Sequence, residues 1–285
     1  MQNHLYYRPW LSRRFRMEAG LSVLGRDWGM GSLDSLFFQK TPDFLHYRQT
    51  KEEGIRENLG KYYLSDLSQA EESLFLEWVL KKASNEGLAL DDLHTEPLLN
   101  FSLNISEDLS LIRISDSEAI LALASIFFPN HWSPEEKFAK DFLAVHAPVP
   151  NMQKINASHL ALLGAALKKD QPMVRFAWGI ATDKRLNHHP TPPPGIAYEA
   201  WHGRSPSLNG SLYARVERQV LAGVPKTDLI YFSIRTYFTD FSMMNNEDLD
   251  CIRACILDMD EAILNYKGLS SCKDLVLEKI LRLMS

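Results

Sequence analysis

Residues 212–238 read LYARVERQVLAGVPKTDLIYFSIRTYF, and this stretch decides the fold because it predicts two β-strands in succession. In the second run, large apolar side chains alternate with Tyr231, Ser233 and Arg235. A period of two is the signature of a strand whose two faces differ. We therefore expect a sheet with one apolar face and one face that carries polar and cationic groups.

Further runs of strand character lie upstream, at residues 98–105, 109–115, 118–128 and 173–182, with polar turns between them. Residues 131–170 have helical spacing instead. The order of strands, then helices, then three more strands predicts an α+β fold. We expect a single PAS-like antiparallel sheet with helices gathered on one face.

No repeat and no linker interrupts the chain, so we predict one PAS-like domain over residues 95–240. Residues 1–94 are predicted to form an irregular and helical N-terminal flank. Residues 241–285 are predicted to form a helical C-terminal flank. Both flanks should pack on the central domain.

Three helices can be bounded from the sequence. Ser68 and Glu71 form a capping-box signature for a helix that reaches to about Ala83. An asparagine cap and an apolar stripe predict one continuous helix over residues 245–267. Apolar residues at helical spacing predict another helix over residues 137–145.

The composition of the 285 residues, 45% hydrophobic and 24% charged, is typical of a soluble globular protein. A net charge of -5, with the densest basic run confined to residues 13–16, argues against a nucleic-acid partner. No apolar run approaches the roughly 20 residues of a membrane helix, and the N-terminus lacks a signal-peptide core. We expect a cytoplasmic protein without a membrane partner.

Common cofactor motifs are missing from the sequence. Cys251, Cys255 and Cys272 are too few for an iron-sulfur cluster, which usually takes four thiolates. The G-x-G at residues 29–31 lacks the third glycine and the strand-to-helix context of a dinucleotide site. We therefore expect no NADPH, flavin or iron-sulfur site in this chain.

His146 lies in the stretch FFPNHWSPEEKFAKDFLAVHAPVP, residues 127–150, just before Pro148 and Pro150. The prolines fix the backbone and end any helix, so the imidazole is expected at a helix terminus with little freedom. A histidine held in this way is a candidate metal or haem ligand. The alternative is a histidine satisfied by a hydrogen bond at the helix end.

Arg215, Arg218 and Arg235 lie in the two strands of residues 212–238. A guanidinium beside apolar side chains needs a partner, and an anionic ligand with carboxylates or phosphates would supply one directly. Ion pairs at the sheet surface or edge are the alternative for all three arginines.

Glu107 and Asp108 are adjacent acids at the start of a strand, so their side chains should face opposite sides and one at most can face a pocket. An inward carboxylate could bind an ammonium group or relay a proton, and solvation in a turn is the alternative. His188 and His189 precede Pro190 in a long loop, where we expect solvated side chains rather than a joint metal site.

Six ordered segments of the chain resemble the haem-dependent oxidative N-demethylase family. They are SEDLSLI (106–112), FFPNHWSPEEKFAKDFLAVHAPVP (127–150), VRFAWGIATD (174–183), LYARVERQVLAGVP (212–225), FSIRTY (232–237) and YKGL (266–269). The resemblance implies a PAS-type fold that holds haem b, whose iron binds dioxygen and oxidises a small secondary amine with release of formaldehyde. It also implies separate reductase subunits that carry flavin and iron-sulfur centres and deliver electrons from NADPH.

On this resemblance, His146 is the expected proximal iron ligand. Five further side chains are expected to contact the cofactor, the first two at its propionates: Arg215, Arg218, Arg235, Lys137 and Trp178. Glu107 or Asp108 is expected to act in catalysis by holding the ammonium of the amine next to the iron.

The chain departs from the family pattern at two places. Ala177 replaces an asparagine before the strand tryptophan, and Val220, Ala222 and Gly223 replace a threonine and two arginines after the Arg-Gln pair. If those polar side chains serve the substrate or a partner, this member differs in its substrate or has a weaker site.

Two other functions stay open. The protein could be a PAS-like haem or gas-binding sensor module without turnover, or a haem-free small-molecule binder. The N-demethylase and the sensor module both involve haem. They differ in whether a small amine perturbs the haem spectrum and yields formaldehyde. Other histidines that could hold the iron are His131, His159, His188, His189 and His202.

Overall fold

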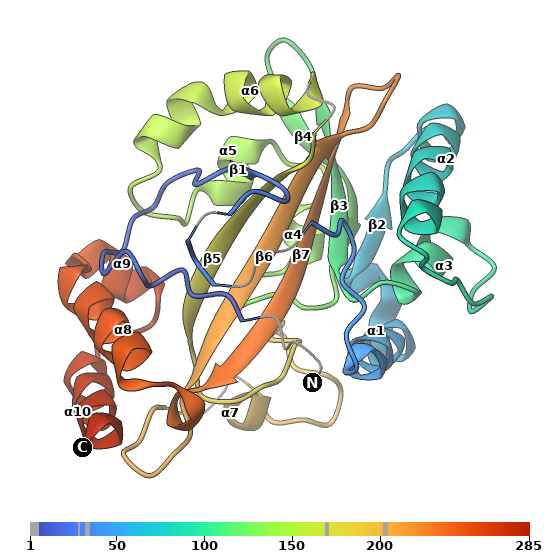
Figure 1. Ribbon diagram of the computed structural model, residues 1–285. Helices are drawn as coiled ribbons and strands as arrows, with labels where there is room; N and C mark the ends of the chain where they lie inside the picture. The colour runs from blue at the N-terminus through green and yellow to red at the C-terminus, as the bar shows by residue number, and fades with distance from the viewer. Residues whose placement is uncertain (1–5, 28, 32–34, 169–170, 202–204) are drawn as a thin grey trace.

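The computed structural model describes residues 6–27, 29–31, 35–168, 171–201 and 205–285 (Figure 1). These described residues form a seven-stranded antiparallel sheet in the order β1-β5-β6-β7-β3-β4-β2. The strands are β1 (Ser22–Val23), β2 (Tyr63–Ser65), β3 (Asp108–Ile114), β4 (Ala119–Ser125), β5 (Met173–Ala181), β6 (Tyr213–Gly223) and β7 (Leu229–Asp240). Without the two short edge strands, the order β4-β3-β7-β6-β5 is that of a PAS-like sheet. The predicted α+β class and single antiparallel sheet are confirmed.

The two faces of the sheet differ, but the expected division into an apolar and a cationic face is wrong, because Tyr231, Ser233 and Arg235 of β7 are buried on the face that also carries the apolar residues of β6. Ala214, Val216 and Val220 are buried on one face, named here the core face. Arg215 and Glu217 point to the opposite face, named the cavity face because it borders a large cavity.

Helices cover both faces. The α-helices are α1 (Phe44–Asn58), α2 (Gln69–Asn85), α3 (Pro97–Leu103), α4 (Pro134–Lys137), α5 (Phe142–His146), α6 (Gln153–Leu167), α7 (Tyr198–Trp201), α8 (Asn246–Asp258), α9 (Glu261–Tyr266) and α10 (Lys273–Met284). Two 3-10 turns are η1 (Leu59–Lys61) and η2 (Phe241–Met243). Helices α2 and α3 and helices α8 to α10 contribute to the clusters on the core face, whereas α6 packs on the cavity face (Figure 1). Helices α2, α3 and α8 to α10 therefore cover one face, and α6 covers the other.

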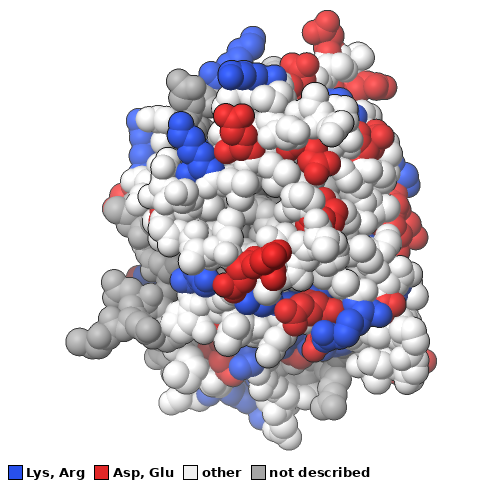
Figure 2. Space-filling view, turned by 90° about the vertical axis from the view of Figure 1, so that its right-hand side faces the viewer, with Lys and Arg blue, Asp and Glu red and all other residues white. Residues whose placement is uncertain are grey.

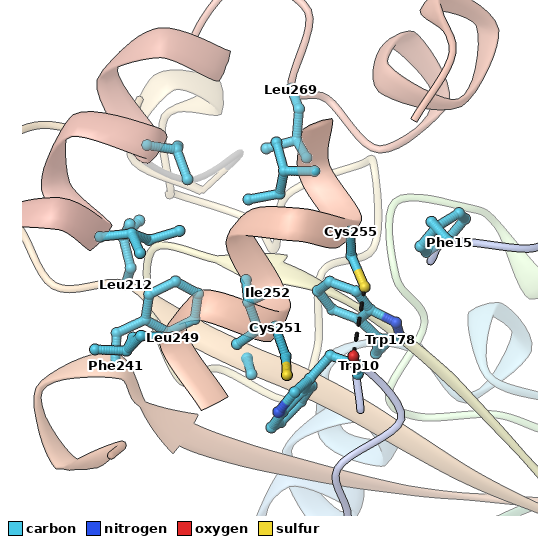
Figure 3. Packing of buried hydrophobic residues seen from close by; sticks show 14 of the residues in the cluster. Trp10, Phe15, Trp178, Leu212, Phe241, Leu249, Cys251, Ile252, Cys255 and Leu269 are labelled. Carbon is cyan, nitrogen blue, oxygen red and sulfur yellow. Dashed lines mark hydrogen bonds between the residues drawn. The ribbon is translucent and has the colours of Figure 1, made fainter. Parts of the chain in front are cut away.

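The N-terminal segment is fastened to α8 and β5 by aromatic side chains. Trp10 packs edge-on against Trp178 with ring centroids 5.8 Å apart. The Cys255 thiol donates a hydrogen bond of 3.6 Å to the carbonyl oxygen of Trp10 (Figure 3). The buried carboxylate of Asp248 accepts hydrogen bonds from the Tyr6 hydroxyl and the Trp10 indole. These tertiary contacts explain why the aromatic residues of this segment follow no regular period.

Residues 98–105 were predicted as a strand, and that prediction is wrong because the segment contains α3. The Glu96 carboxylate accepts hydrogen bonds from the backbone N–H groups of Leu98 and Leu99, and Pro97 occupies the first turn. The helix is buried on nearly all sides. The period of so short an apolar run does not distinguish a helix from a strand, so the Glu96 cap was the sequence feature that indicated a helix.

The continuous helix predicted over residues 245–267 is instead two helices. Met259 has extended backbone with ψ of 132°, which ends α8. The Asp260 carboxylate then accepts a hydrogen bond of 2.8 Å from the Ile263 N–H and starts α9. The apolar stripe crosses the break because both helices bury the same side.

Other elements agree with the sequence. The capping box of Ser68 and Glu71 is present at the start of α2, and the predicted strand runs after residue 108 correspond to β3 to β7. On the face that carries α1 to α3, acidic and basic side chains are interspersed (Figure 2). Among the helices of the described residues, none combines the length and the apolar character needed to cross a lipid bilayer.

Candidate functional site

A cavity of about 1540 Å³ lies on the cavity face of the sheet. Its walls come from β3, β5, β6 and β7, from α5 and α6, from the N-terminal segment and from the residues that follow α9. The volume exceeds the roughly 300–1,000 Å³ of ordinary small-molecule pockets. It therefore has room for a large planar cofactor together with a small substrate.

Small residues leave part of the cavity floor open. Ala177 and Gly179 on β5 lie opposite Glu217 and Arg215 on β6 in the register of the sheet, and all four residues line the cavity. A Cβ atom added at Gly179 would meet no atom within 4 Å. The two polar side chains of β6 thus stand beside an open strip of β5.

The segment that leads to His146 is more broken than the sequence predicted. The single helix expected over residues 137–145 is interrupted at Ala139, whose φ is 57°. The Asp141 carboxylate then accepts a hydrogen bond of 3.0 Å from the Leu143 N–H and starts α5. The same carboxylate accepts a second hydrogen bond from the first N–H group of β4, so it anchors α5 to the sheet.

His146 is the last residue of α5, as expected from the prolines that follow, and it lines the cavity. Its Nδ1 lies 2.9 Å from the carbonyl oxygen of Phe142 and donates to it, so Nε2 carries the lone pair. Burial lowers the pKa of His146, the hydrogen bond to Phe142 opposes this, and the charges of Arg175 and Lys137 lower the pKa further. A neutral imidazole with an available Nε2 is the form that binds a metal.

His159 of α6 is a second imidazole in the cavity wall. Its Nδ1 lies 2.7 Å from the carbonyl oxygen of Asn156. The ring of Phe142 packs between the two histidines, with centroid distances of 4.1 Å to His146 and 5.2 Å to His159. Because both rings point a similar nitrogen away from the backbone, His159 is the alternative ligand that the structure offers.

Three other residues predicted to contact the cofactor also line the cavity with His146: Lys137, Arg215 and Trp178. Arg215 forms an ion pair with Glu217. Arg215 also donates a hydrogen bond of 3.1 Å to the backbone carbonyl oxygen of Phe128, in the loop that follows β4. Trp178 belongs to the aromatic cluster of the N-terminal segment, so it joins the cavity to the core face.

Arg218 and Arg235 do not belong to the cavity lining, because both point to the core face. The Arg235 guanidinium lies 3.5 Å from the ring centroid of Tyr47 and donates a hydrogen bond of 2.6 Å to Thr41. Arg218 donates to the carbonyl oxygen of Leu36. The expectation that Arg218 and Arg235 contact a cofactor in this cavity is therefore not supported by their positions, because residues 36–47 cover the face to which both side chains point.

Glu107 and Asp108 point to opposite sides, as predicted, yet neither of them lines the cavity. Both are fully buried. Asp108 accepts hydrogen bonds of 2.9 and 2.7 Å from the N–H groups of Phe127 and Phe128, and burial raises its pKa. Glu107 accepts a hydrogen bond of 2.8 Å from the N–H group of Gln39. The two acids thus hold the backbone around the site instead of facing a substrate in this cavity.

His188 and His189 are buried, so the expectation of solvated side chains is wrong. His188 lines the cavity wall, and its Nε2 lies 3.0 Å from a carboxylate oxygen of Asp183. The Nε2 of His189 lies 3.0 Å from a carboxylate oxygen of Glu135. The two rings therefore bind different acids, and His202 lies outside the described residues.

Residues 56–277 match the family model of haem-dependent oxidative N-demethylase, alpha subunit-like proteins. The chain belongs to this family. The matched region contains β2 to β7, α5 and α6, so it covers the sheet and the wall that carries His146. The family name implies dependence on haem, and the word subunit implies an assembly with other chains.

The departures from the N-demethylase pattern differ in their relation to the cavity. Ala177 lines it. Val220 and Ala222 are buried in the core-face cluster. A Cβ atom at Gly223 would lie 2.4 Å from the carbonyl oxygen of Leu167, so α6 packs directly on that glycine. Only the change at Ala177 alters the cavity surface.

Several cationic residues of the cavity lining were not predicted from the sequence, and they include Arg175 and Lys267. Both lie within segments that carry the family resemblance, VRFAWGIATD and YKGL. Glu217, a carboxylate of the cavity lining, was also not predicted as a site residue. Strand alternation at β6 was the signal that could have placed Glu217 beside Arg215.

Proposed function

We propose that this chain is a haem-binding oxidative N-demethylase subunit. In the proposed reaction an N-methyl secondary amine and dioxygen, with two electrons and two protons, give the demethylated amine, formaldehyde and water. Separate reductase subunits supply the electrons. The observation that carries the proposal is His146, a neutral imidazole with an available Nε2 at the wall of a cavity of about 1540 Å³.

The residues present fit haem b. The hydrogen bond from His146 Nδ1 to Phe142 fixes the ring and leaves Nε2 for iron, and a histidine ligand is usually oriented by such a bond from its other nitrogen. The open floor at Gly179 leaves space for a planar ring system, and Lys137 and Trp178 lie in the same lining. When bound, haem supplies an iron that binds dioxygen and accepts electrons one at a time.

Glu217 is the acid that best suits the amine in this proposal. It is the carboxylate of β6 that faces the cavity, and Arg215 and Gln219 hold its two oxygens in place. A carboxylate fixed in a partly dry site attracts an ammonium group more strongly than one in water does. Glu217 therefore takes the role that the sequence had suggested for Glu107 or Asp108, which we propose act by positioning the surrounding backbone.

The test is a titration of the haem-loaded protein with dimethylamine, followed by absorption. We expect a spectral change, and formaldehyde should form when an electron source and air are added. Glu217→Gln should retain haem and bind the amine about tenfold or more weakly, since it removes a hydrogen bond to a charged group. Glu77→Gln, an exposed change on α2, is the matched control and should have no effect.

Other outcomes favour the alternatives. Haem without any amine response and without formaldehyde would indicate a gas-binding module and contradict the proposed reaction. A protein that takes up no haem would contradict the whole proposal and favour a haem-free binder. An unchanged amine affinity in Glu217→Gln would remove Glu217 from the substrate site alone.

A further inference from the structure

The charges that line the cavity are not balanced. Arg215 forms an ion pair with Glu217, and Asp183, another acid of the wall, binds His188 and Arg185. Arg175 and Lys267 line the same cavity. Among the described residues, no acid forms an ion pair with either of these two cations.

Arg175 is the more exceptional of the two. It lies on β5 with its side chain on the cavity face, in register with Gln219. Within the described part of the chain, its guanidinium has no hydrogen-bond partner, and its Nε is buried and unsatisfied. Burial lowers the pKa of Arg175, and Glu217 opposes this only by a longer-range attraction. Arg175 as a whole is half-buried, and its buried Nε lacks a partner, so an anionic ligand in the cavity would pair a cationic group that the described residues leave without an anion.

Lys267 adds a second cation to the same region. Its Nζ donates a hydrogen bond of 2.8 Å to the carbonyl oxygen of Trp178 and lies 5.2 Å from the ring centroid of Phe15. Burial lowers the pKa of Lys267 to about 8, and the charges of Arg175 and Arg215 add to the effect while Glu217 opposes it. Because Trp178 and Arg175 both belong to β5, the hydrogen bond to Trp178 places Lys267 beside the strand that carries Arg175.

We propose that Arg175 and Lys267 form an anion-binding end of the cavity that receives carboxylate groups. This inference rests on the proposed function, because the carboxylates that best suit it are the propionates of the haem. A free dicarboxylate has the same chemistry and is the other source. A guanidinium binds a carboxylate through paired N–H groups, and a nearby ammonium adds a third donor.

Three features make Arg175 and Lys267 better suited to this role than the arginines expected from the sequence. Arg215 is already bound to Glu217, and Arg218 and Arg235 point to the core face. Arg175 also lines the same cavity as His146. A carboxylate at Arg175 therefore belongs to a ligand that occupies the cavity of the proposed iron ligand.

The experiment compares haem with haem dimethyl ester, in which both propionates are esterified, by titration of the haem-free protein. The wild type should bind haem at least about tenfold more tightly than the ester, as expected for a hydrogen bond to a charged group. The double variant Arg175→Gln with Lys267→Gln should bind the two porphyrins within about twofold of each other. Arg253→Gln, which removes a half-buried ion pair with Asp250 on α8 outside the cavity lining, is the control and should keep the wild-type preference.

A second readout separates binding from a merely structural role. Because Arg175 lacks an anion in the haem-free protein, Arg175→Gln should unfold at a temperature equal to or above that of the wild type. A structural role predicts the opposite, a lower unfolding temperature together with weaker binding of both porphyrins. That result would overturn the inference.

The remaining outcomes distinguish this inference from the proposed function. Equal binding of haem and its ester by the wild type would overturn the anion site while leaving haem binding intact. If neither porphyrin binds, the proposed function fails, and thermal unfolding in glutarate against chloride of equal ionic strength decides the inference. Stabilisation by glutarate that Arg175→Gln abolishes would support the anion site, and no stabilisation would remove it.

Discussion

Replacing Gly179 by valine should keep haem out of the cavity without unfolding the protein. A Cβ atom at this position meets no atom within 4 Å, so the haem-free protein can accept the side chain. Gly179 lies within β5, where a β-branched residue is favoured and loses less chain entropy on folding than glycine. The free energy of unfolding of the haem-free protein should therefore rise by about 0.5–1 kcal/mol.

The effect on haem should have the opposite sign. A ring system that packs on the floor at about 3.5–4.0 Å has no room for two added methyl groups. Overpacking of this kind typically costs about 1–3 kcal/mol, which corresponds to a roughly 5- to 150-fold loss of affinity. The assay is a titration of the haem-free protein followed by absorption, paired with urea unfolding of the same samples.

Gly164→Ala provides the matched control. Gly164 lies in α6, a Cβ atom there also meets nothing within 4 Å, and the residue is not part of the cavity lining. Alanine should stabilise this helix by about 1 kcal/mol and leave haem affinity unchanged. Wild-type haem affinity in a folded Gly179→Val protein would refute the idea that this strip of β5 is the floor of the haem site.

Four further predictions concern stability and pH. Asp141→Ala removes the cap of α5 and its link to β4, so urea unfolding should show a loss of about 1–2 kcal/mol together with weaker haem binding. The hydrogen bond from Arg113 lowers the pKa of Glu71 to about 2, so the stability this carboxylate contributes is complete above about pH 4.5 and is lost as the pH falls toward 2; Glu71→Gln should flatten that part of the pH profile of urea unfolding. Gly223→Ala should cost about 1–3 kcal/mol in the same assay because its Cβ would lie 2.4 Å from a carbonyl oxygen of α6, and unchanged stability would contradict the close packing seen there. Burial lowers the pKa of His146 from 6.5, so the folded haem-free protein binds fewer protons than the unfolded chain and loses stability as the pH falls below about 6.5; His146→Gln should reduce this slope.

The long strands could be predicted because each strand side faces a different environment. In β7 the apolar residues and Tyr231, Ser233 and Arg235 alternate along the whole run, and a period of two survives in the sequence. The edge strands β1 and β2 have only 2 and 3 residues, too few to show any period. The start of α3 and the break between α8 and α9 each depend on a single capping residue, Glu96 and Asp260. In the sequence, such a capping residue cannot be distinguished from a polar residue in a loop.

The candidate site was harder to predict because its members meet only in three dimensions. His146 stood out through its local proline context, and the structure places it in the cavity wall. Arg218 is adjacent in the sequence to residues that line the cavity, but its side chain points to the opposite face of the sheet. Only the packing of residues 36–47 shows that this face is closed. Arg175 and Lys267 are about 90 positions apart in the chain, and nothing local marks them as neighbours.

The most direct measurement for the central claim is the absorption spectrum of the protein supplied with haem, recorded for the wild type, His146→Ala and His159→Ala. We expect a Soret band in the wild type and in His159→Ala. We expect a lost or shifted band in His146→Ala, which added imidazole restores by occupying the vacated position. An unchanged band in His146→Ala would contradict the assignment of His146 as the iron ligand, and loss of the band only in His159→Ala would transfer that role to α6.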